Sequence, residues 1–423
     1  MDEGIVVRST LLDAPHTELV HEWRERMPPG AMLLEHPAVR FPSYPYEWPP
    51  EMLHAAASCT LTLAEAALDA GFGLKDATPY NVMFEGPNPV FIDILSFRPR
   101  DPLDALWRPH AQFVRTFVYP LLARRYFGFN LNEILLPHRD GLEPERMLRL
   151  CPAWRLLLPP FLTTVALPGI LARRADADHP DHYRPRFARD AGEARFLIGR
   201  LLARTQRLLQ ALKPKPQADA EAYESNHSYS APALTRKEAF ASEAVGSAQS
   251  VLDIGCNSGR FSLLAASRAS VVAIDRDPGA ISALWTRAHK SGLDVLPLVV
   301  DIARPSGASG WANRECASFL DRARGRFDCV LALALIHHLL VTERIPLDAI
   351  FELLAQLTTR LAVVEYVDRE DSQFRHLARG REALHADLSP EVFEATARRR
   401  FEIADSCELT PTRKIYVLVK KER

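Results

Sequence analysis

A glycine-containing turn and two acidic residues form the part of the sequence best suited to bind a ligand. Gly255 and Gly259 lie in the segment Val251-Leu-Asp-Ile-Gly-Cys-Asn-Ser-Gly-Arg-Phe-Ser262, between an apolar run and a helical pattern. Glycine lets the backbone approach a ligand where a Cβ would clash. Asp275 ends the next apolar run, 20 residues after Gly255, which is the spacing of a carboxylate that binds ribose hydroxyls. Asp301 ends the third such run, where it can face an adenine ring.

The ordered set of these motifs resembles the class I S-adenosylmethionine-dependent methyltransferases. The pattern DxGxxxG, an acid ending the second strand and an aspartate ending the third strand follow one another within residues 221–423. One departure is Asn257, which stands where many members have a glycine and which tolerates left-handed backbone better than most residues. The alternatives are a Rossmann turn with incidental acids and an NAD site, although NAD binding normally requires a third glycine.

The resemblance implies S-adenosylmethionine as cofactor and a role for individual residues. Asp253 and Gly255 would shape the loop beside the methionine portion, and Asp275 would bind the ribose. Asp301 would contact the adenine amino group. Cys256 is interpreted as a small residue that fills the loop rather than as a nucleophile. The expected cofactor-binding residues are Asp253, Gly255, Cys256, Asn257, Gly259, Asp275, Arg276, Asp301 and Ile302.

Two adjacent histidines are the candidate catalytic residues. Methyl transfer needs in-line positioning and exclusion of water, and a hydroxyl or protonated amine acceptor also needs a general base. His337 and His338 directly follow the fourth expected strand, and a neutral imidazole can take up a proton near pH 7. The alternative is that one histidine packs and the other caps the turn. A metal site is not expected, because the sequence places no third ligand beside the pair.

Polar and aromatic residues before the first strand and after the fifth could line the acceptor pocket. In this superfamily the segment before the first strand often folds over the cofactor as a lid. The candidates for lid or acceptor contacts are Tyr223, His227, Tyr229, Glu365 and Tyr366. A purely structural role is the alternative for Glu365 and Tyr366.

A second constellation, Asp76, Asn81 and Asp93, lies in the N-terminal half. An aspartate, an asparagine five residues later and an aspartate that ends a strand resemble the catalytic loop and metal-binding aspartate of kinase-like phosphotransferases. The departures are Leu74, where histidine is common, the lack of a glycine after Asp93, and the lack of a glycine-rich loop in residues 1–74. We interpret the set as a kinase-like remnant that builds a scaffold or substrate site. Simple hydrogen bonding of a turn and a working phosphotransferase are the alternatives.

The elements that must position the first set of residues alternate between short apolar runs and helical patterns. This alternation is typical of a parallel sheet covered by helices on both faces, and such a sheet binds ligands at the carboxyl ends of its strands. We therefore expect an α/β, Rossmann-like domain, for which the resemblance implies a mostly parallel sheet of seven strands. The expected strands are 251–255, 271–275, 295–301, 327–335, 361–367 and an edge strand at 414–420, and the expected helices are 260–269, 278–292, 346–359 and 391–400.

The N-terminal half is expected to be a helix-rich α+β domain. Residues 49–71 have a helical pattern, and residues 81–97 predict a β-hairpin around a Gly-Pro-Asn turn. Residues 102–212 have mostly helical periodicity. The sequence KPKPQADA has the composition of a linker. The expected organisation is an N-terminal domain at 1–212, a linker at 213–220 and a methyltransferase domain at 221–423.

Composition limits the compartments in which the chain is expected to lie and the partners that it is expected to bind. A balance of 52 basic and 53 acidic residues lacks the basic excess of nucleic-acid binders, so a nucleic-acid acceptor is not expected. The six cysteines include no CxxC pair, which indicates a reducing compartment and hence the cytoplasm. The uncharged stretch 156–172 is shorter than a membrane span and contains three prolines, so no span is expected.

Together these patterns predict an enzyme that transfers a methyl group to an oxygen or nitrogen atom of a small-molecule acceptor. The alternatives are a nonenzymatic regulator or scaffold that binds S-adenosylmethionine, and a bifunctional enzyme with a phosphotransferase-like N-terminal half. The sequence leaves open the identity of the acceptor, the need for a general base and the oligomeric state.

Overall fold

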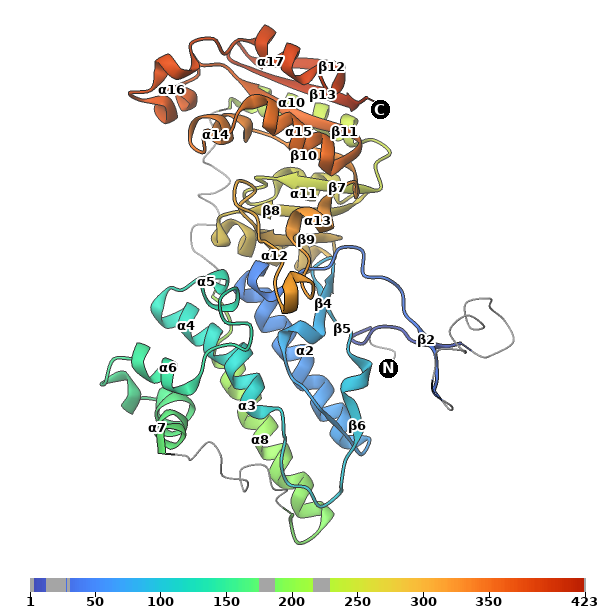
Figure 1. Cartoon of the computed structure of the whole chain (residues 1–423), viewed down its shortest axis with the longest axis vertical. Helices are drawn as coiled ribbons and strands as arrows, with labels where there is room; N and C mark the ends of the chain where they lie inside the picture. Colours follow the sequence, from blue (N-terminus) through green and yellow to red (C-terminus); the bar gives the residue numbers. More distant parts are fainter. Residues whose placement is uncertain (1–3, 13–27, 29–30, 175–186, 216–228, 422–423) are drawn as a thin grey trace. The chain divides into compact units, whose positions relative to one another are not determined.

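Seven strands of the C-terminal half pair in one sheet in the computed structural model of the chain (Figure 1). The order across the sheet is β12–β13–β11–β10–β7–β8–β9. Strands β7 to β11 pair in parallel, whereas β13 is antiparallel to both β11 and β12. This arrangement confirms the predicted Rossmann-like α/β fold. The strands are β7 (Ser250–Ile254), β8 (Ser270–Asp275), β9 (Val295–Val299), β10 (Phe327–Ala332), β11 (Thr358–Val367), β12 (Phe401–Thr410) and β13 (Arg413–Lys420).

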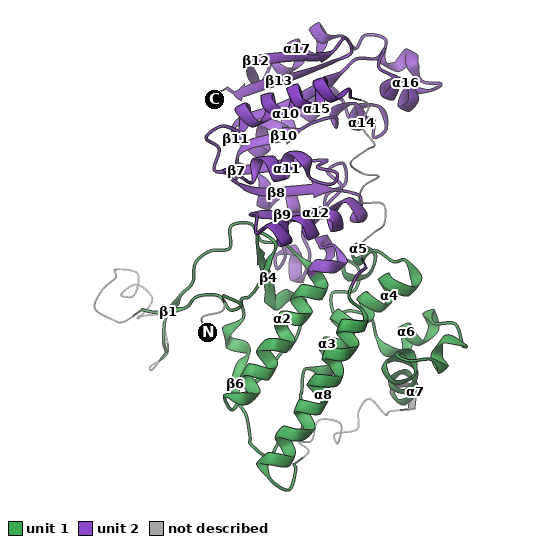
Figure 2. Ribbon diagram, turned by 180° about the vertical axis from the view of Figure 1, so that it is seen from behind, with its two compact units in different colours: residues 1–45, 53–213 green, residues 46–52, 214–423 purple. Residues whose placement is uncertain are grey.

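The structure describes residues 4–12, 28, 31–174, 187–215 and 229–421. The chain divides into two compact units (Figure 2), residues 1–45 with 53–213 and residues 46–52 with 214–423. Most of the expected linker at 213–220 therefore lies outside the described residues. Unlike the continuous domain expected at 1–212, the first unit lacks residues 46–52, which group with the second unit.

Helices cover the sheet of the second unit. Helices α11 and α12 contact β8, α15 packs on β10 and β11, and α10 and α17 contact β12. The parallel strands are mostly apolar because both faces of the sheet are covered; Val363 and Val364 on β11, for example, are fully buried. The helices are α10 (Ala231–Val245), α11 (Arg260–Ala265), α12 (Pro278–Ser291), α13 (Phe319–Ala323), α14 (Ile336–Val341), α15 (Leu347–Leu357), α16 (Ser372–Ala378) and α17 (Pro390–Ala397).

Strand β12 is the one strand of this seven-stranded sheet that the sequence pattern missed, and the prediction that residues 414–420 form an edge strand is wrong. Strand β13 lies between β11 and β12, and β12 forms the edge. The reason is that β12 carries Glu402, Asp405 and Glu408, which interrupt its apolar pattern. An edge strand tolerates such charges because much of it stays in water.

The first unit is rich in helices, as predicted. The expected helix at 49–71 corresponds to α2 (Pro50–Asp69), and the expected hairpin corresponds to β4 (Val82–Glu85) and β5 (Asn88–Phe91). No helix in the described part of the chain is long and apolar enough to cross a membrane. The remaining α-helices of this unit are α3 (His110–Phe113), α4 (Tyr119–Phe127), α5 (Leu131–Leu135), α6 (Pro144–Leu150), α7 (Leu167–Arg174) and α8 (Ala191–Ala211), and its short strand pairs are β1 (Thr10–Leu11) with β2 (Leu34–Glu35) and β3 (Phe72–Leu74) with β6 (Phe97–Pro99).

Gly259 at the start of α11 tests how tightly this fold constrains the turn after β7. Its φ is +84°, and an added Cβ would lie 2.2 Å from Cδ1 of Leu284 on α12. We expect Gly259→Ala to lower the free energy of unfolding by about 3 kcal/mol, from left-handed strain plus overpacking. Gly292→Ala is the matched control, because Gly292 has φ +64° but no atom within 4 Å of the added Cβ, and it should cost only about 1 kcal/mol. Equal losses in urea unfolding would contradict the packing argument.

Candidate functional site

A pocket of about 520 Å³ opens at the carboxyl ends of the parallel strands. Gly255 follows β7, Asp275 ends β8, Asp301 comes shortly after β9, and His337 lies on α14 after β10. Parallel strands bring all of these ends to one edge of the sheet, which is where the sequence predicts a ligand. The predicted residues that line the pocket are Tyr229, Gly255, Cys256, Asn257, Asp275, Arg276, Asp301, Ile302, His337 and His338.

The turn after β7 is held against the end of β8. The backbone N–H groups of Gly255 and Cys256 donate to the carbonyl of Ile274, at 2.8 and 3.1 Å. Gly255 and Asn257 both have positive φ, +72° and +51°. Asn257 thus adopts the left-handed conformation that asparagine tolerates, and the turn forms without a middle glycine.

The carboxylate of Asp275 ties this turn in place and also faces the pocket. One oxygen accepts the N–H of Asn257 and the other accepts the N–H of Asp277, both at 2.9 Å. Burial raises the pKa of Asp275, and the two backbone hydrogen bonds oppose that shift. Each carboxylate oxygen can accept a further hydrogen bond, so Asp275 keeps acceptor capacity for hydroxyl donors in the pocket.

Asp253 and Gly259 support the turn from behind rather than lining the pocket. Asp253 is only 3% exposed, and its carboxylate accepts a 2.6 Å hydrogen bond from Ser262 on α11. Burial outweighs that hydrogen bond and raises the pKa of Asp253 to about 6. Gly259 is required by the close approach of Leu284. Their contribution is therefore to the shape of the turn.

Ion pairs close the rim of the pocket beyond β9. Arg304 pairs with Asp301 at 3.2 Å and with Glu343 at 2.7 Å, and Glu343 also lies 3.5 Å from Arg276. The backbone N–H of Ala303 donates to the other Asp301 oxygen. Sequence reasoning missed Glu343, because it follows α14 in a segment without a recognisable motif.

His337 and His338 line the pocket, but their environments disfavour protonation. His337 is 4% exposed; burial, with the neighbouring His338 and the charge of Arg413, lowers its pKa to about 3. Burial also lowers the pKa of His338, with the charges of Arg276 and Arg413 acting in the same direction. Both imidazoles are therefore neutral at pH 7. His337 is the weaker proton acceptor, and His338 is the better candidate for a base.

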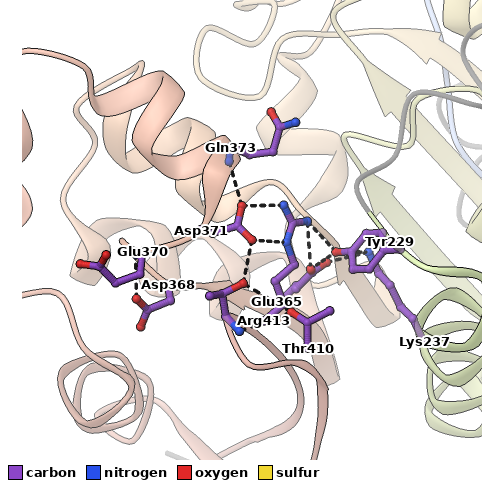
Figure 3. Close-up of polar contacts among 10 residues, drawn as sticks. Tyr229, Lys237, Glu365, Asp368, Glu370, Asp371, Gln373, Thr410 and Arg413 are labelled. Atoms are coloured by element: carbon purple, nitrogen blue, oxygen red, sulfur yellow. Dashed lines mark hydrogen bonds and ion pairs between the residues drawn. The ribbon is translucent and has the colours of Figure 1, made fainter.

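A buried ion cluster forms one wall of the pocket; it consists of Tyr229, Lys237, Glu365, Asp371 and Arg413 (Figure 3). Arg413 on β13 makes two hydrogen bonds to Asp371, at 2.8 and 2.9 Å, and a third to the hydroxyl of Tyr229, at 2.8 Å. Lys237 on α10 pairs with Glu365 on β11 at 2.6 Å, and the Tyr229 hydroxyl donates to Glu365. Burial raises the pKa of Asp371, but the hydrogen bonds from Arg413, the Gln373 N–H and Thr412, together with the charge of Arg413, hold it at about 2. Two cations and two anions balance one another, which is what allows four charges to be buried.

Two of the expected lid and acceptor residues, Tyr229 and Glu365, belong to the buried ion cluster. Tyr229 lines the pocket, whereas Glu365 is completely buried beneath it. The expectation that Tyr366 contacts the acceptor is not met, because its ring packs against Phe393 at 5.2 Å and its hydroxyl donates to Asp368. Tyr223 and His227 lie outside the described residues. The pocket residues that sequence reasoning missed include Lys237, Gln373 and Arg413.

In the first unit, Asn81 and Asp93 meet, while Asp76 has a different partner. The Asn81 amide donates to Asp93 at 3.2 Å, and Asp76 accepts from Gln112 at 3.4 Å. The described residues contain no group of three or more histidine, cysteine, aspartate or glutamate side chains that could hold a metal ion. The kinase-like interpretation stays a prediction.

Comparisons with known proteins agree with the methyltransferase fold. Residues 194–397 match a family described as a methyltransferase domain. Nodulation protein NoeA from Rhizobium meliloti (strain 1021) is 32% identical over 386 residues, which cover 89% of this chain and 79% of that protein.

Two solved structures with similarity to the chain are described as methyltransferases. N-methyltransferase NodS from Bradyrhizobium japonicum WM9, in complex with S-adenosyl-L-homocysteine, has a TM-score of 0.35 and 13% identity, over 49% of this chain and 100% of that chain. The bifunctional kinase-methyltransferase WbdD has a TM-score of 0.32 and 20% identity, over 44% of this chain and 38% of that chain.

The depressed pKa of His337 predicts a specific pH dependence of stability. Between pH 6.5 and about 3 the unfolded chain binds a proton at His337 that the folded chain does not, so stability is lost as the pH falls. Replacing His337 with glutamine removes the contribution of this proton to the pH dependence of the free energy of unfolding. From pH 7.5 to pH 5, we expect His337→Gln to lose about 2 kcal/mol less unfolding free energy than the unmodified chain. His376→Gln, at an exposed histidine, is the matched control; equal pH dependence of the unmodified chain and His337→Gln would refute the assignment.

The buried ion cluster predicts an unequal cost for two arginine substitutions. Arg413→Met leaves Asp371 and Glu365 buried without their guanidinium partner, and we expect it to cost about 3–5 kcal/mol of unfolding free energy. Arg398→Met removes an exposed pair with Glu394, one helical turn away, and should cost less than about 1 kcal/mol. Similar shifts in the urea midpoint for the two variants would show that the cluster contributes little.

Proposed function

The chain belongs to the family of nodulation protein NoeA, with a methyltransferase domain in its C-terminal half, and we propose that it transfers a methyl group from S-adenosylmethionine to an oxygen or nitrogen atom of a small-molecule acceptor. The observation that carries this proposal is the set of residues that line the pocket. It combines the turn after β7 and Asp275 with the neutral His337 and His338. A cofactor site and candidate acceptor contacts therefore share one cavity.

The residues present fit the cofactor of this domain, S-adenosylmethionine. We assign Asp275 to the ribose hydroxyls, because its carboxylate faces the pocket and retains acceptor capacity. Apolar side chains beside it, Val300 and Ile302, suit a flat adenine ring. Gly255, with positive φ, lets the backbone come close to the methionine portion. The cofactor supplies a methyl group already activated by the adjoining sulfonium.

The work left to the protein is positioning, exclusion of water and removal of a proton. A hydroxyl acceptor would have to lose its proton, and an amine would have to be neutral, to attack the methyl carbon as its bond to sulfur breaks. We assign the proton to His338, because its imidazole is neutral and lines the pocket. His337 is assigned to orient the acceptor, since burial holds its pKa at about 3. Gln373 and Arg413 offer further hydrogen-bond donors to the acceptor from the same wall.

The acceptor is proposed to be a small molecule for two reasons. The net charge of −1 gives no general attraction for nucleic acid, and the pocket has the size of a small-molecule site. The name of the relative assigns that protein to nodulation. We infer that the acceptor of this chain is a small molecule that takes part in the same process. The N-terminal domain expected at residues 1–212 is assigned to recruiting or shaping this acceptor.

Asp275→Ala tests the assigned cofactor site. The variant removes the acceptor for the ribose hydroxyls and the anchor for the Asn257 N–H, so the dissociation constant for S-adenosylmethionine should rise by more than about tenfold, or about 1.5 kcal/mol. Calorimetric titration measures this change. Glu402→Ala, at an exposed carboxylate on the edge strand, is the control and should bind like the unmodified chain. An unchanged affinity of Asp275→Ala would sink the assignment.

Methyl transfer itself is tested with cofactor labelled on the methyl group. Incubation of the chain with labelled S-adenosylmethionine and extracts of its own cells should label a small molecule, which mass spectrometry then identifies. With that acceptor, His338→Gln should lower kcat by about 100-fold or more, the usual contribution of a general base. Tight cofactor binding without any labelled product would favour the alternative of a nonenzymatic regulator that binds S-adenosylmethionine. An unchanged kcat in His338→Gln would exclude His338 as the general base.

A further inference from the structure

Residues 46–52, here named the N-terminal strap, lie far from the methyltransferase domain in sequence but belong to the second compact unit. Tyr46, Trp48 and Met52 of the strap are 3%, 1% and 0% exposed. The match to the methyltransferase family begins only at residue 194. The unit that contains the pocket is therefore completed by a segment that lies outside the family match.

Glu47 is the polar centre of the N-terminal strap. It is only 1% exposed, and its carboxylate accepts hydrogen bonds from the guanidinium of Arg322 on α13 and from the hydroxyl of Ser306, the latter at 2.6 Å. The side chain of Arg322 is 4% exposed. Burial together with the charge of Glu47 raises the pKa of Tyr46. Ser306 and Arg322, which bind Glu47, both lie between β9 and β10.

The same connection between β9 and β10 begins in the pocket. Asp301 and Ile302 line the pocket wall, and Arg304 ties the rim to Glu343. Ser306 follows two residues later, and its carbonyl accepts the N–H of Phe319 at the start of α13. Residues 301–306 thus run from the pocket wall at one end to the strap contact at the other.

The part of this connection before α13 is mostly irregular, with a 3₁₀ turn at Trp311–Asn313 and a bridge between Ser309 and Cys316. Residues 303–315, ARPSGASGWANRE, are rich in glycine, serine and alanine and include a proline, and Ala312 and Asn313 have positive φ. Such a segment forms no strand of the sheet and gains little from local propensity, so contacts from outside must offset the entropy of ordering it. The buried ion pair of Glu47 with Arg322 and the hydrogen bond to Ser306 are contacts of that kind.

We propose that Glu47 is a positioning residue for the cofactor, acting through Ser306 and Arg322 on the loop that presents Asp301 and Ile302. The inference rests on the proposed function, because it takes the pocket to be the S-adenosylmethionine site. It places a determinant of cofactor affinity in the N-terminal part of the chain, where the family match does not reach. The methyltransferase site is then formed jointly by residues before 53 and residues after 228.

Ser306→Ala and Glu47→Gln in the full-length chain test the proposal. Ser306→Ala breaks the contact to Glu47 without leaving a buried charge unpaired, so it keeps the test valid even if Glu47→Gln fails to fold. We expect the dissociation constant for S-adenosylmethionine to rise about threefold in Ser306→Ala and about tenfold in Glu47→Gln, with kcat at saturating cofactor within about twofold of the unmodified chain. The double variant should bind S-adenosylmethionine no more weakly than Glu47→Gln does, because the two changes remove the same interaction.

Asp104→Asn is the matched control. Asp104 is also a buried carboxylate with an arginine partner, Arg108, but it lies in the first unit. The Asp104→Asn variant should leave the affinity for S-adenosylmethionine unchanged even if it lowers the free energy of unfolding. Unchanged affinity in both Ser306→Ala and folded Glu47→Gln would overturn the proposal, and so would an equal loss in Asp104→Asn.

Amide hydrogen exchange separates this proposal from the proposed function. In the chain without cofactor, Glu47→Gln and Ser306→Ala should speed exchange in residues 301–318, whereas Asp104→Asn should not. Unchanged exchange there in both variants would refute the link between strap and loop, whatever the pocket binds. Failure of the unmodified chain to bind S-adenosylmethionine would instead refute the function of the pocket, and with it the role of Glu47 in cofactor affinity.

Discussion

The parallel pairing of β7 with β8 on one side and β10 on the other is the constraint on which the site depends. It places the carboxyl ends of these strands at one edge of the sheet, so that residues separated by more than 80 positions, Gly255 and His337, line the same pocket. The backbone turn after β7 then needs its positive φ at Gly255 and Asn257 because it must bend back at that edge. The hydrogen bonds from this turn to Ile274 and Asp275 lock it to the neighbouring strand.

Buried charge shapes the opposite side of the pocket. The buried ion cluster joins α10 and β13, which are distant in sequence, to β11 and the start of α16. Because its charges balance, Arg413 and Lys237 can border the cavity while remaining paired. Their positive charge also reaches the histidines, adding to burial in lowering the pKa of His337. The cluster therefore acts both as a structural link between elements and as an electrostatic influence on the candidate catalytic residues.

Much of the sheet and of the cofactor side of the pocket could be predicted from the sequence, since both follow from local patterns. Buried parallel strands are continuous apolar runs, and a glycine turn with acids at strand ends keeps a regular spacing. Strand β12 escaped detection because Glu402, Asp405 and Glu408 interrupt its pattern. Glu365 was a candidate for an acceptor contact, with a structural role as the alternative, and Lys237 and Arg413 hold it beneath the pocket. Arg413 itself carries no motif, and only pairing across the sheet brings it to the site.

The sequence by itself determined the class of fold, the turn at Gly255 and the acidic residues at the ends of β8 and β9, because these depend on residue type and short-range spacing. Tertiary structure alone decided which charges are paired, which imidazole is more deeply buried and that Glu47 reaches the loop after β9. These properties arise from contacts between residues far apart in the chain, such as the 275 positions between Glu47 and Arg322. Burial and charge act through space, and so the protonation of His337 and the support of the pocket wall could be established only once the chain was folded.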